Sequence, residues 1–138
     1  MLCKHRKGEL AMSEGKVMQT GTTGEQAKTK VGVQGVPETM LQTLFARAAE
    51  SEKENHHIYD KKAIEIVSQL DYDFSKAESD KLMSSGVIAR TIVLDRLVND
   101  YLTKHPDAIV VNIACGLDTR CYRMKGKYLC WYNVDLPE

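Results

Sequence analysis

The chain has 138 residues, and its 19 Lys and Arg residues are balanced by 19 Asp and Glu residues. This length suits at most one domain, and the balanced charge leaves no basic surface of the kind that nucleic acids or anionic membranes attract. The longest apolar run, over residues 108–115, is too short to span a bilayer. The N-terminus has no apolar signal segment and no two cysteines have C-x-x-C spacing, so we expect a reduced, cytoplasmic protein without nucleic-acid or membrane partners and without a metal site.

The N-terminal segment, residues 1–35, has no aromatic residue and no sustained apolar period. Such a segment buries too little surface to offset the entropy lost on ordering it. We therefore expect a flexible N-terminal extension, and the alternative is a lid that orders over a bound ligand. The rest of the chain divides into a helical segment, 36–106, and a βαβ unit, 107–138.

Four helices are expected before the strands. The first covers residues 37–48, where apolar residues recur on one face. Asp60 can cap a second short helix, and the S-x-x-E sequence that begins at Ser75 has the spacing of a capping box for a third. The longest periodic stretch, 87–102, follows Gly86 and predicts the fourth helix.

The pattern then changes to that of strands. Residues 108–115 form a continuous apolar, β-branched run, which is typical of a parallel strand buried on both faces. Asp118 can cap a short helix over 119–124, and residues 128–134 form a second aromatic and β-branched run. This order predicts a βαβ unit with two parallel strands.

The turn after the first strand points to chemistry. Ala114, Cys115 and Gly116 are small residues at which a ligand can approach the backbone closely. Asp135, at the end of the next strand, is placed to accept hydrogen bonds from ribose hydroxyls. Only Gly116 matches the glycines of a dinucleotide fingerprint, and Thr119 takes the third position, so close contact with a pyrophosphate is disfavoured. S-adenosylmethionine, a nucleoside ligand without phosphates, suits the turn better.

The sequences VNIACGLDTRCYRM and WYNVDLPE resemble the first and second motifs of the leucine carboxyl methyltransferase family. That family comprises S-adenosylmethionine-dependent O-methyltransferases, including polyketide-associated members. Upstream, ETMLQTLFARAAES and GVIARTIVLDRLVNDYL resemble its N-terminal helical region. The resemblance covers about residues 36–138 and implies a Rossmann-like α/β methyltransferase fold truncated after its second strand, acting on a carboxyl or hydroxyl group of a small-molecule or peptide acceptor. The family usually has Gly where this chain has Ala114.

Arg90 lies on the expected apolar face of the longest helix, and a buried guanidinium needs an anionic partner. The matching arginine of the family holds the carboxylate of the cofactor, and the resemblance implies that role here. The alternative is an internal salt bridge to Asp95 or Asp118. Arg120 and Arg123 are expected to pair with acidic neighbours rather than with a ligand. The expected S-adenosylmethionine site consists of Arg90, Ala114, Cys115, Gly116 and Asp135.

Two other functions stay open on the sequence alone. An NAD-binding oxidoreductase fragment would share the strand, the turn and the ribose-binding acid, and a non-catalytic remnant or interaction module would bind no cofactor. Because the resemblance implies a sheet of about seven strands and only two are identifiable here, we expect an N-terminal fragment that is inactive on its own. No catalytic residue can be named. His56 and His57 are adjacent and point to different faces, so a polar loop is favoured over a metal site.

Overall fold

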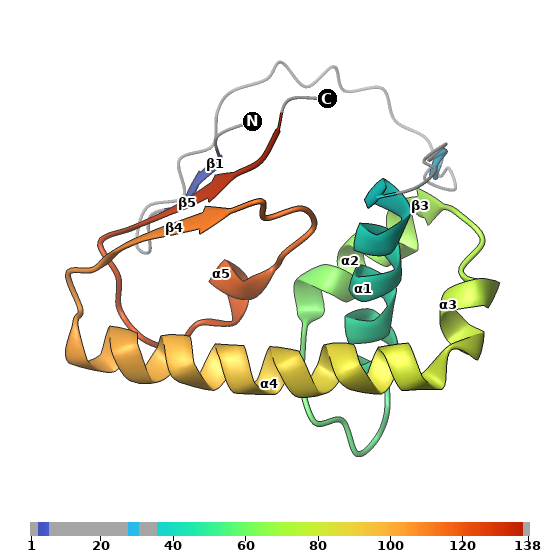
Figure 1. Cartoon of the computed structure of the whole chain (residues 1–138), viewed down its shortest axis with the longest axis horizontal. Helices are drawn as coiled ribbons and strands as arrows, with labels where there is room; N and C mark the ends of the chain where they lie inside the picture. The colour runs from blue at the N-terminus through green and yellow to red at the C-terminus, as the bar shows by residue number, and fades with distance from the viewer. Residues whose placement is uncertain (1–2, 6–27, 31–35, 137–138) are drawn as a thin grey trace, which may run out of the picture.

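The computed structural model describes residues 3–5, 28–30 and 36–136. Most of the N-terminal extension expected over 1–35 therefore lies outside the described residues. The fold mixes helices and strands (Figure 1). The elements are β1 (Cys3–His5), β2 (Thr29–Lys30), α1 (Val36–Ser51), α2 (Lys61–Gln69), β3 (Leu70–Asp71), α3 (Ser75–Ser79), α4 (Lys81–Lys104), β4 (Ile109–Ile113), α5 (Arg120–Arg123) and β5 (Cys130–Val134).

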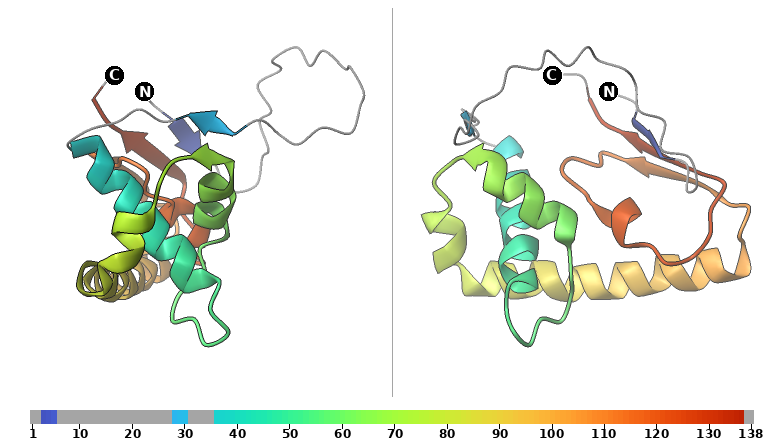
Figure 2. Two further views of the ribbon diagram at one scale, coloured as in Figure 1. Left: turned by 90° about the vertical axis from the view of Figure 1, so that its right-hand side faces the viewer. Right: turned by 180° about the vertical axis from the view of Figure 1, so that it is seen from behind.

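The long helix α4 forms the base on which the other elements are arranged. The sheet and α5 lie over its C-terminal half, whereas α1, α2 and α3 gather at its N-terminal half (Figure 1). Seen from behind, both groups stay on the same side of α4 (Figure 2). The turn that follows β4 extends from the sheet toward α1 (Figure 1).

The main sheet has the strand order β1-β5-β4. Strands β4 and β5 are parallel, in a register that runs from Ile109 opposite Cys130 to Ile113 opposite Val134. Strand β1 pairs antiparallel with the other side of β5, and the short β2 and β3 form a separate parallel pair. The parallel pairing expected of the two strands is confirmed.

Strand β4 is half-buried on one face and exposed on the other, so the expectation of burial on both faces is wrong. Ile109, Val111 and Ile113 are 59%, 56% and 76% exposed. Val110, on the opposite face, packs against the cluster that contains Trp131. A continuous β-branched run predicts a strand, but burial also requires an element on each face, and no described element covers this one.

The cap expected at Asp60 is confirmed, because its Oδ1 accepts a hydrogen bond from the N–H of Ala63, 3.0 Å away, at the start of α2. The capping box expected at Ser75 is wrong. Ser75 is already inside α3, and its N–H donates instead to Oδ1 of Asp73 at 3.0 Å. An acidic residue two positions earlier thus provides the acceptor for this helix terminus.

The fourth helix begins earlier than expected, at Lys81 rather than after Gly86. Asp80 provides the cap, since its Oδ1 accepts from the N–H of Met83 at 2.9 Å, and one glycine inside a long helix costs only about 1 kcal/mol. The helix expected over 119–124 is shortened to Arg120–Arg123. Asp118 still accepts a hydrogen bond from the backbone N–H at its start.

Two apolar clusters hold these elements together. One lies between α4, α5 and β5 and centres on Leu102 and Trp131, both 1% exposed. The other joins α1 to α2 through Leu44, Ala48 and Ala63. Together they fix the turn after β4 between the sheet and α1. No described helix combines the length and the apolar character that a bilayer crossing requires.

Candidate functional site

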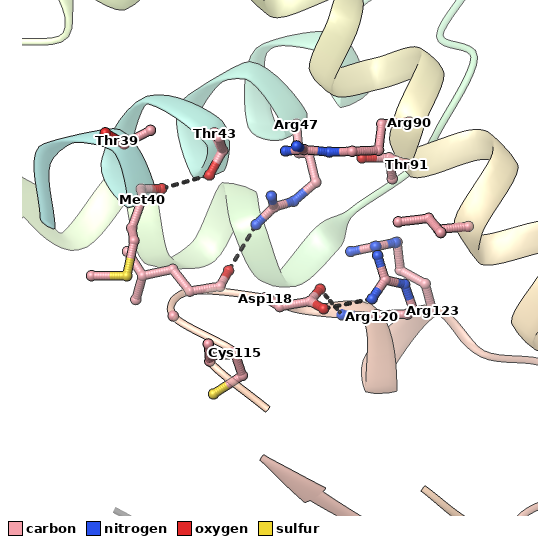
Figure 3. A pocket seen from close by; sticks show the side chains of 14 residues that line it. Thr39, Met40, Thr43, Arg47, Arg90, Thr91, Cys115, Asp118, Arg120 and Arg123 are labelled. Carbon is pink, nitrogen blue, oxygen red and sulfur yellow. Dashed lines mark hydrogen bonds and ion pairs between the residues drawn. The ribbon is translucent and has the colours of Figure 1, made fainter. Parts of the chain in front are cut away.

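A cavity of about 460 Å³ opens between α1, α4 and the turn after β4 (Figure 3). This volume is within the range of small-molecule sites in proteins. The structure brings Arg90 of α4 into one cavity with Ala114, Cys115 and Gly116 of the turn. The other lining residues are Thr39, Met40, Thr43, Arg47, Thr91, Leu94, Leu117, Asp118, Arg120 and Arg123.

The turn itself uses two residues in the left-handed region. Ala114 has a φ of 52° and Gly116 a φ of 48°. Glycine adopts this conformation freely, whereas an alanine there is strained. A Cβ on Gly116 would also lie 2.5 Å from Sδ of Met40. Conformation therefore favours glycine at 116, and a larger residue there would also force the side chain of Met40 to move. Ala114 keeps a strain that the glycine usual in the family would not have.

Asp135 joins the end of β5 to this turn. Its Oδ2 accepts a hydrogen bond from the N–H of Gly116, and its Oδ1 accepts one from the N–H of Leu136 at 2.8 Å. The Gly116 and Leu136 N–H groups lower the pKa of Asp135, so it carries a full negative charge at neutral pH. Asp135 does not line the cavity. A carboxylate has further acceptor capacity, and its contact with ribose hydroxyls stays a prediction.

Arg90 is exposed, so the expectation that it is buried is wrong. The buried face of α4 passes through Val87, Ile88 and Thr91, and Arg90 lies just outside this stripe, at the mouth of the cavity. Its side chain points across the cavity toward α1 (Figure 3). The alternative of a salt bridge to Asp95 or Asp118 is also wrong, since those carboxylates pair with other arginines.

Four arginines of the described residues line the cavity, and three of them are neutralised by carboxylates. Arg120 pairs with Asp95 at 2.9 Å and with Asp118 at 2.8 Å, and Arg123 pairs with Asp95 at 2.7 Å. The pairing of Arg120 and Arg123 with acidic neighbours is thus confirmed. In the described part of the chain, Arg90 has no hydrogen-bond or ion-pair partner. Among the described residues that line the cavity, Arg90 is therefore the one cation without a carboxylate partner.

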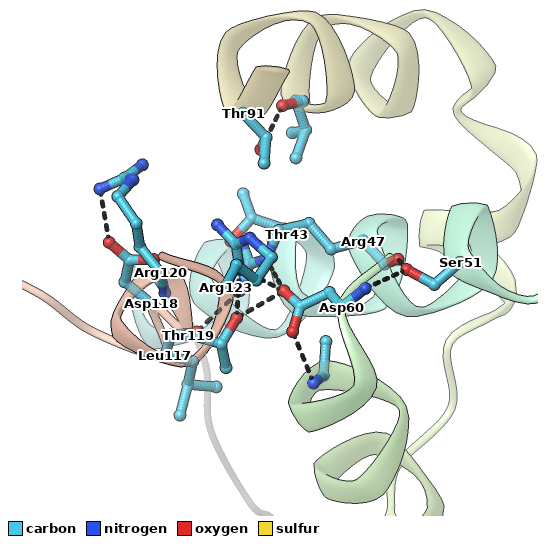
Figure 4. Close-up of polar contacts among 12 residues, drawn as sticks. Thr43, Arg47, Ser51, Asp60, Thr91, Leu117, Asp118, Thr119, Arg120 and Arg123 are labelled. Atoms are coloured by element: carbon cyan, nitrogen blue, oxygen red, sulfur yellow. Dashed lines mark hydrogen bonds and ion pairs between the residues drawn. The ribbon is translucent and has the colours of Figure 1, made fainter. Parts of the chain in front are cut away.

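Arg47 and Asp60 form a buried pair that the sequence reasoning missed. Nε of Arg47 lies 3.1 Å from Oδ2 of Asp60, and their side chains are 8% and 0% exposed. Burial lowers the pKa of Arg47, which the charge of Asp60 partly restores. The same Oδ2 also accepts from Thr119 and Arg123 (Figure 4). One signal was available, because Arg47 lies between Leu44 and Ala48 on the apolar face of its helix.

The loop after α1 has its own polar cluster, outside this cavity. Glu50 accepts hydrogen bonds from Nζ of Lys53 at 2.6 Å and from the backbone N–H of His57 at 3.0 Å, and Nδ1 of His57 lies 2.7 Å from its Oε1. These contacts, with that of Lys53 the largest, lower the pKa of Glu50 to about 2. The described residues contain no group of three potential metal ligands. His57 thus has a carboxylate partner in Glu50.

The comparison with known proteins assigns the class and the family. The class of the matched proteins is that of methyltransferases, and one relative is named as S-adenosyl-L-methionine-dependent. The chain belongs to the leucine carboxyl methyltransferase family, whose profile matches residues 40–138. Its turn after β4 and its cavity both lie within the matched region. The family implies the methyltransferase fold, and the observed mixture of helices and strands agrees with it.

Two curated relatives are named as methyltransferases. The tetracenomycin polyketide synthesis O-methyltransferase TcmP of Streptomyces glaucescens is 38% identical over 105 residues, which cover 75% of this chain and 39% of that protein. The S-adenosyl-L-methionine-dependent methyltransferase dpfgK of Gibberella zeae is 35% identical over 118 residues, with coverages of 78% and 40%. The chain spans about two fifths of the length of these relatives. No solved structure matches.

Proposed function

We propose that this chain forms the S-adenosylmethionine-binding part of an O-methyltransferase and that the cofactor binds in the cavity between α1, α4 and the turn after β4. The observation that carries the proposal is the unpaired guanidinium of Arg90, which points into a cavity whose other described arginines are all neutralised. A guanidinium is well suited to a carboxylate, which it can bind with two hydrogen bonds. The amino-acid end of S-adenosylmethionine carries such a group.

The residues present fit the rest of the cofactor in outline. The small side chains and left-handed turn at Ala114 and Gly116 allow a ligand close to the backbone. Asp135, next to Gly116, retains lone pairs for the ribose hydroxyls. When bound, the cofactor supplies an electrophilic methyl group on its sulfonium. The chain's own residues bind and orient the cofactor and hold water away from one side of it.

The acceptor belongs to the same proposal. We infer a carboxyl or hydroxyl group on a small molecule or peptide, and the name of the polyketide O-methyltransferase TcmP supports a small molecule. A carboxylate is already ionised at neutral pH and needs no general base, so the site residues named here would suffice on the cofactor side. The cytoplasmic setting is also proposed, with support from the free thiols of Cys115 and Cys130.

A dinucleotide fits this site less well. Thr119 occupies the third fingerprint position and is 2% exposed. Its hydroxyl donates a hydrogen bond to Asp60. This buried β-branched residue takes the place of the third glycine, which in a dinucleotide fingerprint lets the helix pack closely against the strand. The observation favours S-adenosylmethionine over NAD.

Isothermal titration calorimetry with S-adenosylhomocysteine tests the proposal directly. This product analogue keeps the carboxylate and the adenosine and has no methyl group to transfer, so it reports binding alone. We expect saturable binding of S-adenosylhomocysteine and none of NADH at the same concentrations. Binding of NADH in its place would favour the oxidoreductase. Binding of neither compound would favour a non-catalytic module.

A further inference from the structure

We propose that Asp60 is the positioning residue of the cavity: it contacts no ligand and holds, through Arg47 and Thr119, the loop 117–119 that forms one wall (Figure 4). The assignment goes beyond the role of Asp60 as a helix cap. The importance of Asp60 for catalysis rests on the proposed function of the cavity. Its role in fixing the loop rests only on contacts within the ligand-free protein.

The contacts of Asp60 join parts of the chain that are far apart in sequence. Its Oδ1 serves the N-terminus of α2, whereas its Oδ2 faces α1 and the segment after Gly116. Its backbone N–H donates to Oγ of Ser51 at 2.8 Å. With a side chain that is 0% exposed, the carboxylate has no water to replace a lost partner. The contacts of Oδ2 therefore constrain the loop more strongly than surface contacts would.

Arg47 carries the constraint from Asp60 to the loop. Its Nε is held by Oδ2 of Asp60, and its NH2 group donates to the carbonyl oxygen of Leu117 at 2.7 Å. Thr119 is held by Asp60 directly. The two tethers lie on either side of Asp118, which lines the cavity and pairs with Arg120. The path of the loop that follows Gly116 is thus set by one buried carboxylate.

Asp60 also controls the charge of the cavity. It is the one carboxylate that pairs with Arg47 among the described residues. Without it, the buried guanidinium would be uncompensated, and such a charge is strongly unfavourable in a protein interior. The guanidinium of Arg47 would then turn into the cavity that it lines. It would lose its contact with Leu117 and add a second free cation beside Arg90. Asp60 therefore keeps the loop in place and the cavity matched to a single carboxylate.

The test is hydrogen exchange of the ligand-free protein carrying Asp60→Asn. Asparagine keeps an oxygen for the N–H of Ala63 and nearly the same volume, and it removes the charge that holds Arg47. We expect amides in residues 116–124 to exchange about tenfold faster or more, with little change in the C-terminal half of α4. The matched control is Asp80→Asn, another helix-capping aspartate, which is exposed and has no arginine partner in the described residues. It should leave 116–124 unchanged.

A second variant covers the case in which Asp60→Asn does not fold. Thr119→Val removes one tether at constant shape, and it should raise exchange in the same segment by a smaller factor. The proposal is supported if the increase is confined to 116–124. It is overturned if both folded variants leave this segment unchanged, or if exchange rises equally along the whole chain.

Binding measurements then separate this inference from the proposed function. If the unmodified protein binds S-adenosylhomocysteine, Asp60→Asn should weaken that binding about tenfold and make it sensitive to sulfate, which would compete for the second free guanidinium. If the unmodified protein does not bind the analogue, the proposed function fails, while the exchange result still decides whether Asp60 positions the loop.

Discussion

Replacing Arg90 by methionine should weaken binding of S-adenosylhomocysteine and leave the stability of the free protein almost unchanged. Methionine keeps much of the apolar stem and removes the guanidinium. Because Arg90 is exposed and unpaired in the described part of the chain, no internal carboxylate loses its partner. We expect the free energy of unfolding to change by no more than about 0.5 kcal/mol, as for an ordinary surface substitution.

The magnitude for the ligand follows from the kind of contact. Hydrogen bonds to a charged group contribute about 1.5–3 kcal/mol. Losing that contribution raises the Kd by about 10- to 150-fold. The cavity is open to solvent at Arg90, which favours the lower end of this range.

Calorimetry with two ligands identifies the contact. S-adenosylhomocysteine has the carboxylate, whereas adenosine lacks it, so Arg90→Met should weaken binding of the first and leave the second unaffected. Arg96→Met is the matched control, because Arg96 is exposed on the same helix and does not line the cavity. The reasoning is refuted if Arg90→Met binds S-adenosylhomocysteine as tightly as the parent, or if adenosine loses affinity equally.

Further predictions concern the turn and the loop after α1. Ala114→Gly should stabilise the protein by about 0.5–1 kcal/mol in urea denaturation, because relief of left-handed strain exceeds the added entropy of the unfolded chain; a destabilised variant would contradict this. Gly116→Ala should destabilise it by at least about 1 kcal/mol, and adding Met40→Ala should recover only the steric part. Asp135→Ala should raise the Kd for S-adenosylhomocysteine about 5- to 150-fold, and unchanged affinity would exclude the ribose contact. The depressed pKa of Glu50 contributes stability above pH 4.5 that is lost as the pH falls toward 2; Glu50→Gln should flatten that part of the curve of melting temperature against pH.

Local features of the fold could be predicted from the sequence. The parallel strand pair, the cap at Asp60 and the small-residue turn at Gly116 each depend on a few neighbouring residues. Their signals are the β-branched run, an acceptor before an apolar helix, and glycine where a left-handed conformation is needed. These signals predicted the local structure correctly, whereas the equally local capping box at Ser75 did not form.

Features that depend on distant residues could not be predicted in the same way. Asp60 gains its second role from Arg47, Thr119 and Arg123, which are 13, 59 and 63 residues away. The half-exposed state of β4 depends on which elements lie over each face. For Arg90, the periodicity predicted the helix correctly but placed the residue in the buried stripe. In the structure the stripe is rotated by a fraction of a turn about the helix axis, and Arg90 lies at the cavity mouth.

The exposure of Arg90 also suits a binding role better than burial would. A buried arginine without a partner would destabilise the free protein, and one with an internal partner would have to break that contact before it could bind a ligand. Arg47 and Arg123 are in the second situation, with Asp60 and Asp95 as their carboxylates. Arg90 is in neither situation in the described part of the chain, because its exposed charge is solvated. Under the proposed function, the paired arginines among the described residues build the wall of the cavity, and Arg90 is the one expected to recognise an anion.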